Sequence, residues 1–62
     1  MKEYILFETV ADYEDALEFI LDEDVRDVTT NSGQLEIAVN MYDLRLVERI
    51  LDSAVIPYQI YR

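Results

Sequence analysis

The spacing of apolar residues along the chain predicts four β-strands. Residues 3–9 (EYILFET) are rich in β-branched and aromatic side chains, and residues 35–41 alternate apolar with polar or small ones. Two shorter runs, residues 25–30 and 58–61, have a similar character, and all four are typical of strands. Gly33, the only glycine, stands between the second and third runs, where we expect it to take a positive φ in a turn.

Two further segments have the period of a helix with one buried side. The first is expected to begin at Asp12 as N-cap, and its apolar stripe comprises Tyr13, Ala16, Leu17, Ile20 and Leu21. The second is expected to begin at Asn40 or Asp43 and to end before Pro57, and its stripe comprises Leu44, Val47, Ile50, Leu51 and Ala54. The predicted order along the chain is therefore β-α-β-β-α-β.

This order predicts a single α+β domain over residues 1–62. Right-handed crossovers lead to a ferredoxin-like sandwich, in which two helices cover one face of a four-stranded antiparallel sheet. A small α+β fold with another strand order is the alternative. The step from Ala54 through Ile56-Pro57-Tyr58 resembles the helix-to-edge-strand junction of small regulatory domains with the ferredoxin-like fold.

The composition argues against catalysis and against bound metal. The chain has no cysteine and no histidine, which removes disulfides, thiolate metal sites and the usual general base at neutral pH. One glycine leaves no glycine-rich phosphate loop. If Asp22 is taken as the first position of a calcium-binding loop, Asp27 falls where glycine is required. We therefore expect no enzyme activity, no cofactor and no metal.

The charge points to a basic protein as partner. Fourteen acidic residues against five basic ones give a formal net charge of −9. Such a chain is not expected to bind nucleic acid or anionic membranes directly. No apolar run approaches the roughly 20 residues of a membrane span, and the N-terminus lacks the features of a signal peptide, so we expect a cytoplasmic protein.

The acids are concentrated on the first predicted helix. Seven of residues 12–24 are carboxylic acids, and the like-charged pairs Glu14–Glu18 and Glu18–Asp22 are each unfavourable by a few tenths of a kcal/mol. Solubility alone would account for such a face. A docking surface is the sharper interpretation, because Phe19 lies outside the apolar stripe and would be either an interface anchor or a ring tucked into the core. The predicted partner-binding residues are Asp12, Asp15, Glu18, Phe19, Asp22 and Glu23.

The strand pattern predicts a homodimer. If Ile5 and Phe7 meet the helices, Tyr4 and Leu6 point out of the open sheet face, and Tyr61 repeats this on the last strand. An apolar outer face on so short a chain favours a second copy as its cover. The alternative is that Tyr hydroxyls reach water and that the first strand is simply central. The predicted dimerisation residues are Tyr4, Leu6 and Tyr61.

In size, charge and compactness the chain resembles small acidic bacteriophage proteins that neutralise host nucleic-acid machinery. Those proteins often carry carboxylates in place of DNA phosphates, so the resemblance implies an inhibitor or adaptor that occupies a basic groove. It rests on no motif, and no residue role carries over. The alternative is an ACT-like regulatory or dimerisation domain that binds a small ligand at a strand–helix junction. Against it, the segment FETVADY lacks the glycine-rich turn expected there.

Overall fold

The structure is a computed structural model in which residues 1–61 are described, with side chains described as far as residue 60. The elements, in chain order, are β1 (Lys2–Leu6), α1 (Val10–Asp22), β2 (Val28–Asn31), β3 (Glu36–Asn40), the short 3-10 helix η1 (Met41–Asp43), α2 (Leu44–Ser53) and β4 (Gln59–Tyr61).

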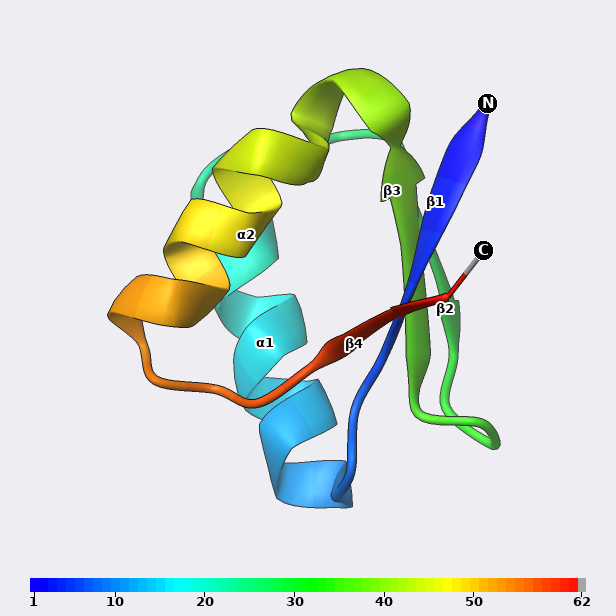
Figure 1. The fold of residues 1–62 in the computed structure, drawn as a ribbon, viewed down its shortest axis with the longest axis vertical. Coiled ribbons are helices and arrows are strands. Elements are labelled where there is room, and N and C mark those ends of the chain that lie inside the picture. Colours follow the sequence, from blue (N-terminus) through cyan, green and yellow to red (C-terminus); the bar gives the residue numbers. More distant parts are fainter. Residues whose placement is uncertain (62) are drawn as a thin grey trace.

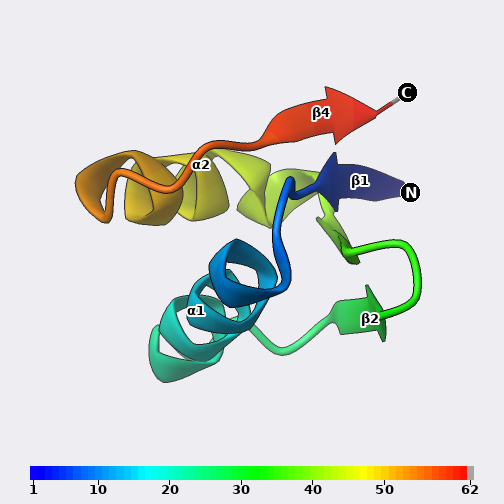
Figure 2. The same ribbon diagram turned by 90° about the horizontal axis from the view of Figure 1, so that it is seen from below.

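The strands form one antiparallel sheet with the order β2-β3-β1-β4, so β1 and β3 are central. Both helices lie on the same side of this sheet (Figures 1 and 2). In Figure 2, α2 lies beside the β4–β1 half and α1 beside the β3–β2 half. The predicted α+β class, with a four-stranded antiparallel sheet and two helices, is confirmed.

The core fills the space between the helices and one face of the sheet. Ile5 of β1 pairs with Ile37 of β3, and both side chains are fully buried. The residues that complete the buried cluster are Phe7, Tyr13, Ala16, Ile20, Val25, Val39, Leu44, Val47, Leu51 and Ile56. Burying a branched aliphatic side chain contributes about 1.5–3 kcal/mol, so this cluster is the main source of stability.

Helix α1 begins three residues earlier than the sequence predicts. Its N-cap is Thr9, whose Oγ1 accepts a hydrogen bond from the backbone N–H of Asp12 at 3.1 Å. The strand before it ends at Leu6, but the backbone N–H of Phe7 still donates to the carbonyl of Leu35 at 2.9 Å. The chain turns directly after that anchored residue, which places a threonine, itself a good capping residue, at the cap position.

The turn between β2 and β3 also differs from expectation. Gly33 does not have a positive φ; Leu35 takes that conformation instead, with a φ of 52°. The chain reverses direction in two successive turns. The backbone N–H of Gln34 donates to the carbonyl of Asn31, and the backbone N–H of Leu35 donates to the carbonyl of Ser32. The half-buried side chain of Leu35 packs against the core, and this contact holds the residue in a conformation that leucine otherwise avoids.

Candidate functional site

The carboxylates of α1 form the most acidic surface of the molecule. Glu14, Asp15, Glu18, Asp22 and Glu23 are exposed, and Asp12 is half-buried in the first turn. Five of them stand opposite or beside the buried stripe that Tyr13, Ala16 and Ile20 form, while Glu23 is the C-cap. The helix thus holds its predicted carboxylates on one rigid element. We call these six residues the acidic face.

No side chain of the described residues neutralises the acidic face. The two ion pairs among residues 1–61 are Lys2–Asp27 and Arg26–Asp24, and neither involves a residue of the face. The last turn of α1 contains no basic residue, although the helix dipole favours a cation there and Asp22 and Glu23 occupy that end. The charge of the acidic face therefore remains available to a partner.

The acidic face has the charge density of a nucleic-acid strand. From Asp12 to Glu23 the helix rises about 16 Å at 1.5 Å per residue. Six carboxylates over that length give about one negative charge per 3 Å. One strand of B-DNA carries a phosphate every ~3.4 Å along its axis. The carboxylates of α1 are therefore spaced along the helix axis about as closely as the phosphates of one DNA strand.

Phe19 is not a core residue. Its side chain is 44% exposed, whereas that of the next residue, Ile20, is fully buried. Phe19 lies on the edge of α1 that faces α2, where it lines a groove between the two helices. This placement excludes the fully buried position that the sequence left open, and it leaves an aromatic ring accessible beside the acidic face.

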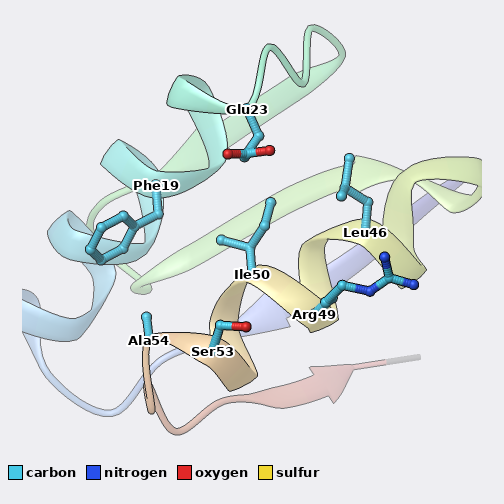
Figure 3. A pocket seen from close by; sticks show the side chains of 7 residues that line it. All are labelled: Phe19, Glu23, Leu46, Arg49, Ile50, Ser53 and Ala54. Atoms are coloured by element: carbon cyan, nitrogen blue, oxygen red, sulfur yellow. The ribbon is translucent and has the colours of Figure 1, made fainter.

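The groove has an apolar floor and charged edges (Figure 3). Its volume is about 570 Å³. Phe19 and Glu23 line it from α1 and its C-cap, and the α2 side contributes Leu46, Arg49, Ile50, Ser53 and the C-cap Ala54. Leu46 is 38% exposed and Ile50 is half-buried, so apolar surface is open to solvent along the groove.

The two arginines of α2 do not form the surface ion pairs that their spacing with Glu48 and Asp52 predicts. Neither Arg45 nor Arg49 takes part in an ion pair with any other residue of the described chain. Arg49 lines the groove, and Arg45 lies one turn before it on the same side of α2. One edge of the groove is therefore basic, and the other, which α1 provides, is acidic.

Sequence reasoning missed the contribution of α2. The predicted stripe included Ile50 and Ala54 but not Leu46, which falls on the flank of the stripe rather than in it. The available signal was the spacing of Leu46 and Ile50, because residues four apart on a helix are neighbours. On α1 the opposite error occurred: Leu21 was assigned to the buried stripe, yet it is exposed on the flank away from Phe19.

The open sheet face is the second candidate surface. Tyr4 is 40% exposed and Leu6 half-buried, opposite the buried Ile5 and Phe7, as the alternation predicts. Their cross-strand partners on β3 are Ala38 and Glu36, so one aromatic and one aliphatic side chain lie at the centre of this face. Tyr61 pairs with Tyr4 in the register of β4, but its side chain lies outside the described part of the chain.

A polar cluster closes one end of the sheet face. Lys2 Nζ donates to the carboxylate of Asp27 at 2.6 Å and to Thr29 Oγ1 at 3.2 Å, and the amide of Asn40 donates to the same carboxylate at 3.3 Å. Hydrogen bonds from Lys2 and then from Asn40 lower the pKa of the Asp27 carboxyl. The cluster connects β1, β3 and the start of β2 and neutralises its own charge.

Other kinds of site find little support in this geometry. Nowhere in residues 1–61 do three carboxylates come together in a way that would hold a metal ion. Within the same residues, no helix has both the length and the apolar character needed to cross a membrane. No family model, curated protein or solved structure is significantly similar to this chain.

Proposed function

We propose that this chain is a small protein-binding inhibitor or adaptor that docks α1 onto a basic surface of another protein. The observation that carries the proposal is the acidic face, whose six carboxylates repel one another and find no cation within residues 1–61. A helix selected only for stability would carry lysines among its glutamates. The exposed ring of Phe19 supplies an apolar anchor inside a charged rim, which is the usual anatomy of a binding hot spot.

The proposed mechanism is competition with nucleic acid. The acidic face occupies a groove of the partner whose lysines and arginines otherwise contact phosphates, and the similar charge spacing lets one surface replace the other. Long-range attraction between the chain, at −9, and a basic partner raises the association rate and weakens with added salt. No chemical step is involved, and we propose no catalytic role.

We further propose a ferredoxin-like sandwich that pairs with a second copy in the cytoplasm. Two crossover connections support the fold assignment. Helix α1 connects β1 to β2, and β3 lies between these two strands in the sheet. Helix α2 connects β3 to β4, and β1 lies between them. Pairing through Tyr4 and Leu6 is supported by the low charge of the sheet face, where Lys2 and Asp27 neutralise each other and Glu8 and Glu36 are the expected exceptions.

The alternative function is an ACT-like regulatory domain with a small ligand. The groove volume, about 570 Å³, is in the range of small-molecule sites and favours this alternative. The position of the groove does not, because it lies between two helices, whereas such domains place effectors at strand–helix junctions. At the junction after β1, the Thr9 side chain caps α1, and neither groove-lining helix segment includes this junction.

Competition for a captured partner tests the proposal. The chain is immobilised and exposed to bacterial lysate at low salt, and the retained protein is purified and its affinity for the chain is measured with and without double-stranded DNA. We expect a basic nucleic-acid-binding protein that DNA displaces and that high salt releases. A partner that binds DNA and the chain simultaneously, or whose affinity does not change with salt, would exclude the competitive mechanism.

A further inference from the structure

The groove between α1 and α2 is electrically asymmetric. Its α1 side bears Glu23 and, on the adjoining helix surface, Asp15 and Asp22; its α2 side bears Arg49, with Arg45 one turn earlier on the adjoining surface of α2. Ile50 and Leu46 lie between Glu23 and Arg49, and Phe19 continues the apolar lining on the α1 side (Figure 3). Glu23 and Arg49 both line the groove, yet they form no ion pair with each other or with any other described residue. Both charges are therefore free to meet a ligand.

The groove offers mainly side chains. It lies between two helices, whose interior peptide groups are hydrogen-bonded within each helix, so along most of its length a strand finds no row of alternating free N–H and C=O groups to pair with. An extended peptide binds through such groups at a sheet edge. A surface of apolar side chains between two polar edges instead matches one face of an amphipathic helix, which presents anchors at positions i, i+3, i+4 and i+7.

We propose that the groove accepts an amphipathic α-helix of the partner, with apolar anchors seated on Phe19 and Leu46, a basic flank against α1 and an acidic flank against Arg49. This inference rests on the proposed function, because it names the partner element that meets the acidic face. It adds a requirement that charge alone does not impose: the apolar residues of the partner helix must lie on one side.

Two synthetic peptides of identical composition test the requirement. The first carries leucines at helical spacing on one face, lysines on one flank and fewer glutamates on the other, over a length of about 16 residues to match α1. The second has the same residues with the leucines distributed around the helix. Fluorescence anisotropy measures the affinity of each for the full 62-residue chain. We expect the first peptide to bind at least about tenfold more tightly.

Two variants of the chain complete the experiment. Phe19→Ala is expected to remove most of the difference between the peptides, whereas Leu21→Ala, a smaller truncation at a similarly exposed apolar residue on the other flank of α1, should preserve it. Equal binding of both peptides to the unaltered chain, or no binding of the first, would overturn the helix-in-groove inference. If both peptides bind equally and the double variant Glu18→Lys, Asp22→Lys abolishes this binding, the acidic face would remain the docking surface and the groove would have no role in binding.

Discussion

The sheet face and the helical side of this domain differ in whether their charged side chains form ion pairs. On the sheet face, Lys2 donates hydrogen bonds to Asp27 and Thr29, and Asn40 donates to the same Asp27 carboxylate, so this carboxylate has two donors beside it, one of them a cation. On the helical side, the acidic face forms no ion pair within the described chain, although Arg49 lines the groove from the facing helix. Ion pairs therefore do form in this small fold, but among the described residues the carboxylates of the acidic face take part in none.

The same contrast appears between two consecutive residues of α1. Ile20 is fully buried against the sheet and α2, while Phe19 is nearly half exposed beside the acidic face. One residue therefore belongs to the core and the other to the candidate binding surface. Substituting each in turn separates stability from recognition.

The largest effect is expected from Ile20→Ala. Removing a fully buried isoleucine costs about 2–5 kcal/mol, from lost burial and the cavity that remains. Native domains are stable by only about 5–15 kcal/mol, so the loss is a large fraction of the total. Urea denaturation measures the free energy of unfolding. A decrease below about 1 kcal/mol would mean that α1 does not pack on the sheet as described.

Phe19→Ala is expected to act on binding instead. Loss of an aromatic anchor weakens the complex with the captured partner by on the order of 2 kcal/mol, or roughly 30-fold. Because the ring is already nearly half exposed, the free energy of unfolding should decrease less than in Ile20→Ala. Titration calorimetry and urea denaturation measure the two quantities. Unchanged affinity together with a core-sized loss of stability would place Phe19 in the core.

The sheet face is tested by Leu6→Glu. A carboxylate at the centre of the proposed dimer contact would be buried without a partner, so the dimer should dissociate at least about tenfold more readily while the fold is retained. Two chains at −9 repel each other, and salt screens this repulsion, so the unaltered dimer should tighten as salt rises. Sedimentation at low and high salt measures both. An unaltered chain that stays monomeric in both conditions excludes the homodimer.

The smallest effect is expected from Lys2→Met, which removes the cation of the sheet-face cluster. Because Lys2 lowers the pKa of Asp27 below its ordinary 3.8, the stabilisation is present above that value and is lost as the pH falls through the lower, folded-state pKa. The melting temperature of the variant should be modestly lower than that of the unaltered chain at neutral pH, and this difference should shrink below about pH 4. Arg26→Met, at the largely exposed pair with Asp24, is the matched control and should have less effect.

The sequence predicted the elements and most of the buried residues because their periods are unambiguous. The alternation around Ile5 and Ile37 and the stripe through Val47 and Leu51 both became core. Errors occurred where tertiary contacts override local preference. Thr9 rather than Asp12 caps α1, because the preceding residues are tied to β3, and Leu35 rather than Gly33 takes the positive φ, because its side chain reaches the core.

The candidate site was predictable in part. A helical wheel places the carboxylates and Phe19 on α1, and these positions depend only on the helix itself. The groove depends on how α1 and α2 approach each other, which no local pattern encodes. Leu46 and Arg49 became part of the site for that reason, and the unpaired state of the arginines follows from the same arrangement.

The most direct test of the central claim compares two double charge reversals. Glu18→Lys with Asp22→Lys alters the acidic face, and Glu36→Lys with Glu48→Lys makes the same change in net charge on β3 and α2 instead of α1. The affinity of the captured partner is measured for both at about 0.15 M salt. We predict a loss of about 100-fold or more for the first pair and no more than about threefold for the second. Equal losses would contradict the claim that α1 is the docking surface and would leave its carboxylates with a role in solubility alone.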